Sequence, residues 1–304
     1  MNAPGRVCPL RYRHGPAAVA RAPARSAEIL YVIGGLYGNL PALDAIEAMA
    51  RDEAGPVTLC FNGDFNWFNV DDAGFRSINE RVLRHQAILG NVEAELDPES
   101  NDAGCGCAYP DHVAQGTVEH SNQIHAALKR TAACHPDLLG RLYGLPMVAR
   151  YRVGNARVGV VHGDAESLAG WRFDAATLDD PAQHDWRAES FALAKVDVFA
   201  STHTCLPATR CFDYAGTKIV ANNGSAGMPN MPGANYGILT RIATTSSPHH
   251  SLYGQVLRGT RIDALAINYD DAVWRAHFLA NWPEGSPAWL SYFNRIASGP
   301  DYRF

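Results

Sequence analysis

Short apolar runs alternate with helical patterns over the first ninety residues, and a glycine or asparagine follows each run. The runs at 28–33, 57–61 and 87–89 predict buried strands. Apolar residues at helical spacing within 40–49 and 71–85 predict the helices that join them. This β-loop-α-β order is typical of a layered α/β sheet with right-handed crossovers.

The second half of the chain contains more consecutive strand patterns than the first. Helices are predicted at 118–133, 137–142 and 181–195. Strands are predicted at 148–153, 157–161, 196–200, 208–212, 218–221, 237–242, 251–257 and 261–268. We therefore expect a second sheet packed against the first.

The composition is that of an ordinary globular chain. Of 304 residues, 47% are hydrophobic and 19% are charged, which argues against disorder and coiled coils. We predict one domain at 28–250, preceded by an irregular arm at 1–27, where four prolines interrupt any amphipathic helix. An aromatic-rich extension at 251–304 is expected to pack on the same domain.

Charge and hydropathy limit the partners. The net charge is −5 and no block of basic residues occurs, so nucleic acid is not expected as a primary partner. No apolar run approaches the ~18–20 residues that span a bilayer, and the N-terminus lacks the apolar stretch of a signal peptide. The seven cysteines, an odd number, do not indicate a secreted disulfide scaffold. We expect a cytoplasmic protein that does not contact a membrane, with its oligomeric state left open.

Four polar side chains stand directly after predicted strands. They are Asp64, Asn91, His162 and His203. In open α/β sheets, ligands bind outside the carboxyl ends of the strands. A carboxylate, an amide and two imidazoles together form a plausible ligand set for zinc, manganese or iron. The sequence therefore predicts a metal site where these loops meet.

Several segments around these residues follow the order of known motifs. The segments are Gly38-Asn39-Leu40-Pro41-Ala42-Leu43, Gly63-Asp64, Gly90-Asn91-Val92-Glu93, Val161-His162-Gly163, Thr202-His203-Thr204-Cys205-Leu206-Pro207 and Asn223-Gly224-Ser225-Ala226-Gly227. Over residues 28–242 the chain resembles the calcineurin-like metallophosphoesterases, particularly their small bacterial phosphodiesterase-like members. The resemblance implies a two-sheet α/β/β/α sandwich and a divalent metal.

The chain departs from the motifs of that family at four positions. Gly35 and Tyr37 stand where the family has an Asp and a His, and Cys205 replaces its last His. The resemblance implies that these three positions serve one metal of a pair, whereas Asp64, Asn91, His162 and His203 serve the other. It therefore implies about one metal ion per chain (Mn, Zn or Fe). Val92 also replaces the His that assists the leaving group in the family.

Cysteines could replace the missing ligands of the second metal. Cys105 and Cys107 lie in the loop after Asn91, and Cys205 occupies a ligand position. They are candidate replacement ligands, and thiolates would favour zinc or iron over magnesium. The alternative is that the Cys-x-Cys pair is a local structural feature.

Three functions remain open from the sequence. The first is hydrolysis of a small-molecule phosphomonoester or phosphodiester at a reduced, mononuclear metal site, with Glu93 or Asp164 orienting water or a ligand. The second is a catalytically impaired relative that binds metal or a phosphate-containing ligand without turnover. The third is a thiolate-metal or redox protein that uses Cys105, Cys107 and Cys205.

Overall fold

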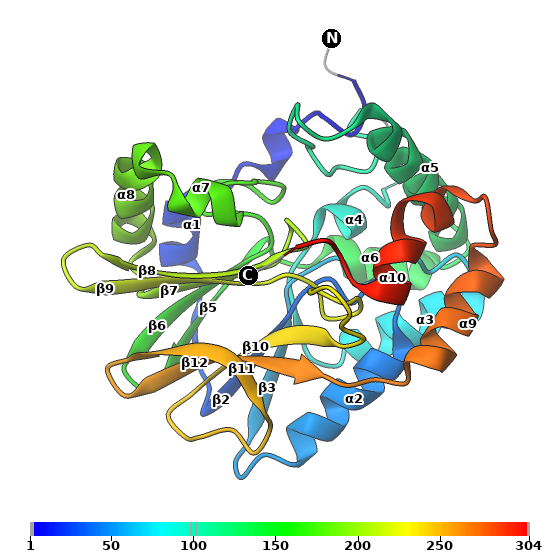
Figure 1. The fold of residues 1–304 in the computed structure, drawn as a ribbon. Helices are drawn as coiled ribbons and strands as arrows, with labels where there is room; N and C mark the ends of the chain where they lie inside the picture. Colours follow the sequence, from blue (N-terminus) through cyan, green and yellow to red (C-terminus); the bar gives the residue numbers. More distant parts are fainter. Residues whose placement is uncertain (1–2, 98, 101, 303–304) are drawn as a thin grey trace.

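Two sheets stacked face to face form the centre of the computed structural model, which describes residues 3–97, 99–100 and 102–302 (Figure 1). Each sheet has six strands within these residues. The first has the order β11 (Ser251–Leu257), β12 (Thr260–Ile267), β10 (Gly237–Ala243), β2 (Ile29–Ile33), β3 (Val57–Phe61), β4 (Gln86–Ala87). The second has the order β1 (Ala24–Ser26), β5 (Val148–Val153), β6 (Ala156–Val161), β7 (Val198–Ser201), β9 (Thr217–Asn223), β8 (Pro207–Asp213).

The alternation of side chains along a strand explains the layering. All five residues of β2 are buried. Leu30 and Val32 pack between the two sheets, whereas Ile29, Tyr31 and Ile33 pack toward the helices. Because successive side chains of a strand point to opposite faces, a strand buried on both faces reads as one continuous apolar run.

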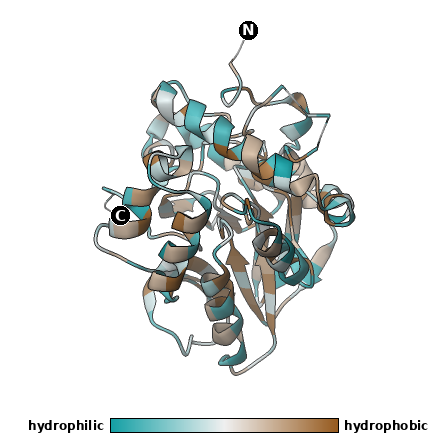
Figure 2. Ribbon diagram, turned by 90° about the vertical axis from the view of Figure 1, so that its right-hand side faces the viewer, coloured by the Kyte–Doolittle hydropathy of each residue, from teal (hydrophilic) through white to brown (hydrophobic). Residues whose placement is uncertain are grey.

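Helices cover the outer face of each sheet. The first sheet is covered by α2 (Leu40–Arg51), α3 (Asp72–Val82), α5 (Gln115–Ala132), α6 (Pro136–Tyr143) and α9 (Asp271–Asn281), whose apolar residues share one core cluster with β2 and β3. The second is covered by α1 (Pro16–Arg21), α7 (Ala175–Asp179) and α8 (His184–Ala194), and the 3₁₀ turn η2 (Pro181–Gln183) lies between α7 and α8 in the chain. Strands in the middle are apolar, and polar residues lie on the surrounding helices (Figure 2). The predicted α/β/β/α sandwich is confirmed.

The first 27 residues, predicted to be irregular, contain regular elements. The 3₁₀ turn η1 (Leu10–Tyr12) precedes α1, and β1 pairs in parallel with β5 at the edge of the second sheet. Pro16 does not prevent α1, because it occupies the first turn of the helix, where a missing N–H costs nothing. The arm is thus part of the sandwich.

The first sheet continues beyond residue 250, where the sequence placed the end of the main domain. β12 pairs with β10 over seven residues, so β11 and β12 belong to the sheet. After α9, the chain forms the π-helical turn η3 (Trp289–Phe293) and α10 (Asn294–Ser298), and the Tyr302 hydroxyl donates to the carbonyl oxygen of Pro207. In the described part of the chain, no helix is both long and apolar enough to cross a bilayer.

Candidate metal centre

Loops from both sheets meet at one end of the sandwich. Asp64 follows β3, Asn91 begins the short helix α4 (Asn91–Ala94), His162 follows β6 and His203 follows β7. One ligand atom from each of Asp64, His162 and His203 lies within 4.8 Å of the other two. Asn91 Oδ1 lies 3.0 Å from His162 Nε2. The structure therefore brings together all four residues that the sequence singled out, and all four are buried.

Two glycines permit this convergence. A Cβ atom on Gly63 would lie 2.4 Å from the Cα of Gly90, and one on Gly90 would lie 2.3 Å from Asp64 Oδ1. Gly63 also has a φ of +92°, which favours glycine. Side chains at these positions would push apart the loops that carry Asp64 and Asn91.

Backbone carbonyl groups fix the tautomers of both imidazoles. His162 Nδ1 lies 2.7 Å from the carbonyl oxygen of Asn62, and His203 Nε2 lies 3.1 Å from that of Cys107. A carbonyl oxygen only accepts, so these two ring nitrogens carry the protons and donate. When both rings are neutral, His162 Nε2 and His203 Nδ1 are therefore the unprotonated nitrogens, and they face each other across 3.2 Å.

The inward-facing atoms are all electron-pair donors. Around His162 Nε2 lie Asn91 Oδ1 at 3.0 Å, His203 Nδ1 at 3.2 Å and Asp64 Oδ1 at 3.3 Å. Ligands bonded at about 2.1 Å to one ion lie about 3.0–3.4 Å apart in octahedral or tetrahedral geometry. The amide of Asn91 is oriented by its Nδ2, which donates to the carbonyl oxygen of Cys105 at 3.0 Å. The residues present thus fit a bound cation.

The pKa values of the bare site reflect this crowding. Burial alone would lower the pKa of His162, but the Asp64 carboxylate outweighs it and raises that pKa. Burial alone would raise the pKa of Asp64, but His162 lowers it. Burial and the adjacent His162 lower the pKa of His203 to about 3. His203 is therefore neutral at physiological pH.

The two carboxylates predicted to orient water or a ligand, Glu93 and Asp164, bond to the backbone. Glu93 accepts from the amides of Asp64 at 2.8 Å and Phe65 at 3.1 Å. Asp164 accepts from three amides in its own loop. Burial, with the nearby Asp64 carboxylate, raises the pKa of Glu93 to about 7. These contacts hold the ligand-bearing loops, and the predicted roles toward water or a ligand stay predictions.

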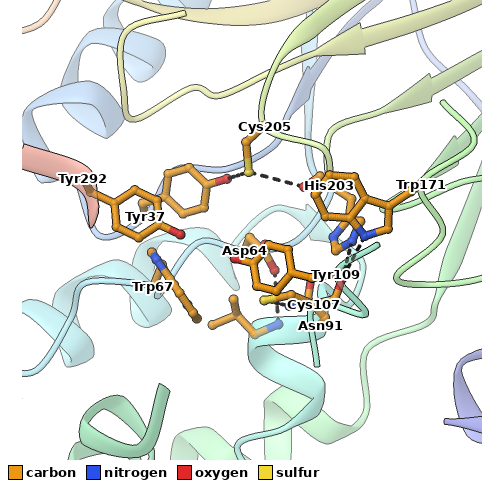
Figure 3. Close-up of a pocket in the computed structure, with 11 residues that line it drawn as sticks. Tyr37, Asp64, Trp67, Asn91, Cys107, Tyr109, Trp171, His203, Cys205 and Tyr292 are labelled. Atoms are coloured by element: carbon orange, nitrogen blue, oxygen red, sulfur yellow. Dashed lines mark hydrogen bonds between the residues drawn. The ribbon is translucent and has the colours of Figure 1, made fainter. Parts of the chain in front are cut away.

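A small cavity lies beside the four residues. We call it the metal cavity; its volume is about 40 Å³ (Figure 3). It is lined by Tyr37, Asp64, Trp67, Asn91, Val92, Cys107, Tyr109, Trp171, His203, Cys205 and Tyr292. At about 10–15 Å³ for each water-sized sphere, this space holds about three waters. A phosphate ester therefore enters only if part of the wall moves.

Tyr37 fills the space beside Gly35. A Cβ atom on Gly35 would lie 2.9 Å from both Cζ and the hydroxyl oxygen of Tyr37. That hydroxyl lies 2.8 Å from Cys205 Sγ, and the thiol donates to the carbonyl oxygen of His203 (Figure 3). The three positions where the resemblance places the ligands of a second metal thus contact one another.

Cys107 and Cys205 line the metal cavity, whereas Cys105 contributes its carbonyl oxygen to Asn91. Burial raises the pKa of Cys107 and Cys205, which favours neutral thiols in the bare site. Among the described residues, the group of mutually close His, Cys, Asp and Glu atoms consists of Asp64, His162 and His203, so no thiol belongs to it.

Sequence reasoning missed the aromatic wall of the cavity. Trp67, Tyr109, Trp171 and Tyr292 come from separate loops and from η3. In the aromatic-rich C-terminal extension, Trp274 is buried in the core, whereas Tyr292 packs against the core and also lines the cavity. No local pattern distinguishes an aromatic residue that lines a cavity from one in the core.

Comparison with known proteins finds similar structures but no similar sequence. No family model matches the chain, and no curated protein matches its sequence. The chain is similar to a metallophosphoesterase of Sphaerobacter thermophilus, with 18% identity and a TM-score of 0.55, over 90% of this chain and 100% of that one. A hypothetical protein of Pyrococcus horikoshii OT3 matches with 14% identity and a TM-score of 0.59, over 90% and 99% of the two chains.

These likenesses establish the architecture. The chain has the metallophosphoesterase fold, as the motif resemblance predicted. At identities this low, similarity of fold does not establish a shared activity. The chemistry therefore follows from the residues of the site itself.

Proposed function

We propose that this protein is a metal-dependent phosphoesterase that hydrolyses a small phosphate ester at one divalent ion held by Asp64, Asn91, His162 and His203. The observation that carries the proposal is the convergence of His162 Nε2 with three further ligand atoms within 3.3 Å of it, while the outer nitrogen of each imidazole donates to a backbone carbonyl group. In a buried site these electron-pair donors need a positive charge among them; a bound cation supplies it fully, whereas in the bare site a proton on His162 supplies it in part, because Asp64 raises the pKa of His162. The proposed location of the activity is the cytoplasm.

Each residue of the proposed site has a distinct role. A bound divalent ion would polarise a phosphoryl oxygen and lower the pKa of a coordinated water. With an ion bound, His162 and His203 would be neutral ligands, because the outer nitrogen of each donates to a carbonyl group and the inner nitrogen would hold the ion. Asp64 supplies the one ligand charge, and Val92 N–H donates to its Oδ1 at 3.2 Å, which fixes the carboxylate.

Tyr37 supports one ion rather than two. Its ring occupies the space into which a side chain at position 35 would project, and its hydroxyl contacts Cys205. A phenol and a thiol whose pKa values are raised by burial are poor ligands at neutral pH. We infer a stoichiometry of one ion per chain.

A second candidate is a protein that binds metal or a phosphate-containing ligand without turnover. The observation that favours it is the wall around the metal centre: Val92 lines the cavity where a proton donor would assist a leaving group. General acid catalysis is typically worth about 10²–10⁴-fold in rate. The proposed enzyme would therefore be slow.

Metal analysis and turnover test the proposal together. Protein purified without chelator should contain about one equivalent of Mn, Zn or Fe by elemental analysis. It should hydrolyse bis(4-nitrophenyl) phosphate or 4-nitrophenyl phosphate with added Mn²⁺. His203→Ala should lose both the metal and the hydrolysis, because Nδ1 of His203 is one of the four inward-facing donors.

The matched control is His250→Ala, which removes an exposed imidazole. It should keep the metal and the rate of the parent protein. One tightly bound ion without hydrolysis of either ester would favour the second candidate. Two tightly bound ions, or metal retained by His203→Ala, would contradict the proposed site.

A further inference from the structure

A second, larger cavity adjoins the metal cavity. We call it the outer cleft; its volume is about 470 Å³, within the range of about 300–1,000 Å³ that ligand sites occupy. It is lined by apolar and small side chains that include Pro110, Trp171, Ala176, Leu206 and Tyr302. Thr204, which directly follows the ligand His203, also lines it. The cleft therefore lies next to the metal centre.

Trp171 is the partition between the two cavities, because it lines both. Its indole N–H donates to the carbonyl oxygen of Cys107 at 2.9 Å, and His203 Nε2 donates to the same oxygen at 3.1 Å. The Trp171 and His203 rings lie edge to face, 5.2 Å apart. The indole is half-buried, so it can turn outward when it gives up this hydrogen bond and its ring contacts with His203 and Tyr109.

The charges around both cavities favour a monoanion. None of the described residues that line either cavity is a lysine or an arginine. Arg295 lies behind Cys205 and donates to the carbonyl oxygens of Cys205 and Pro229. A divalent ion with the Asp64 carboxylate leaves a net charge of +1, which one phosphodiester charge neutralises. A phosphomonoester carries about two charges above its second pKa of ~6, and the excess charge would be buried unpaired.

The outer cleft suits an uncharged organic group. Its acidic residue, Asp174, uses both carboxylate oxygens on Thr177, accepting from the amide at 3.0 Å and from the hydroxyl at 2.6 Å. His112 is exposed at the cleft. The aromatic faces of Trp171 and Tyr302 can pack against an aromatic or aliphatic alcohol.

We propose that the substrate is a phosphodiester with at least one uncharged, apolar arm, and that the outer cleft binds this arm while the phosphoryl group reaches the metal cavity past Trp171. This inference rests on the proposed function and narrows its substrate class. The apolar arm binds in the outer cleft, and movement of the Trp171 indole opens the passage between the two cavities.

Affinity measurements test the inference separately from turnover. The Mn²⁺-loaded protein is titrated by calorimetry at pH 8 with diphenyl phosphate, with phenyl phosphate and with dimethyl phosphate. Diphenyl phosphate should bind at least tenfold more tightly than the other two, because it alone combines a single charge with an aromatic arm beyond the phosphoryl site. Hydrolysis is followed in parallel by product release.

Substitutions then locate the arm. Ala176 lines the cleft and is exposed on α7, so Ala176→Trp should fill the cleft and weaken diphenyl phosphate at least tenfold. The control Ala126→Trp places the same side chain on the exposed face of α5 and should change nothing. Trp171→Ala should speed the association of diphenyl phosphate at least tenfold in stopped flow.

Each outcome bears on the inference. Equal or tighter binding of phenyl phosphate would overturn the charge argument, and unchanged binding in Ala176→Trp would overturn the assignment of the cleft. An unchanged association rate in Trp171→Ala would refute the assignment of Trp171 as the partition between the two cavities. Tight, cleft-dependent binding without hydrolysis would refute the proposed function and leave the assignment of the cleft standing.

Discussion

The substitution Gly35→Asp should destabilise the protein unless Tyr37 is changed with it. Gly35 has a φ of +65°, and a Cβ atom there would lie 2.9 Å from Cζ and the hydroxyl oxygen of Tyr37. Real Cβ atoms do not approach other atoms this closely, so the buried tyrosine ring would have to shift. The restored carboxylate and the tyrosine thus compete for one space.

The expected magnitude has two parts. A non-glycine residue in the left-handed region costs about 1–2 kcal/mol, and overpacking a buried site costs about 1–3 kcal/mol more. Gly233 provides a matched control, because its φ is +70° and a Cβ atom there would meet nothing within 4 Å. Gly233→Asp should therefore show the backbone cost alone, about 1–2 kcal/mol.

Urea unfolding of the two single variants and of a double-mutant cycle with Tyr37→His measures the difference. Tyr37→His removes the two atoms that clash, so the cycle should give a favourable coupling free energy of about 1–3 kcal/mol. A coupling near zero would mean that the ring moves aside freely. Equal destabilisation by Gly35→Asp and Gly233→Asp would refute the reasoning in the same way.

Two further predictions concern activity and stability. The quadruple variant Gly35→Asp, Tyr37→His, Val92→His, Cys205→His should raise the initial rate on an aryl phosphate ester with Mn²⁺ by ~100-fold or more, and a well-folded variant no faster than wild type would contradict this. Asp197 should stabilise the fold above its unfolded pKa of about 3.9, because Arg157 and Lys218 outweigh the opposing effect of burial and lower its pKa; that contribution is lost as the pH falls through the depressed folded value. Asp197→Asn should lower the free energy of unfolding by about 2 kcal/mol at pH 7 in urea and reduce the acid dependence of stability. An unchanged pH profile would show that the ion pairs of Asp197 with Arg157 and Lys218 contribute nothing.

Local patterns predicted most of the architecture. β3 has the predicted bounds of 57–61, and the helix predicted within 40–49 is α2, which is capped by Asn39 accepting from the amide of Ala42. These features depend on side-chain period and cap chemistry, which neighbouring residues determine. The edge strand β1 was missed, because three exposed residues carry no apolar signal and are ordered through pairing with β5.

For the candidate site, the identity of the ligand residues could be predicted from the sequence, whereas their arrangement could not. The sequence alone determined which residues could bind a cation, since Asp64, Asn91, His162 and His203 stand at strand ends and their side chains have the required chemistry. Only the tertiary structure decided which atoms face inward, because the carbonyl groups that fix each imidazole tautomer come from Asn62 and Cys107, distant in the chain.

The size and walls of the cavity were also beyond the sequence. Tyr37 and Tyr292 line the same cavity of about 40 Å³ although they lie at opposite ends of the chain. A cavity is the space that packed elements leave between them, so its volume depends on how both sheets, η3 and the loops meet. Ligand chemistry is a property of single residues and can be read along the chain, whereas access to the ligands is a property of the packing.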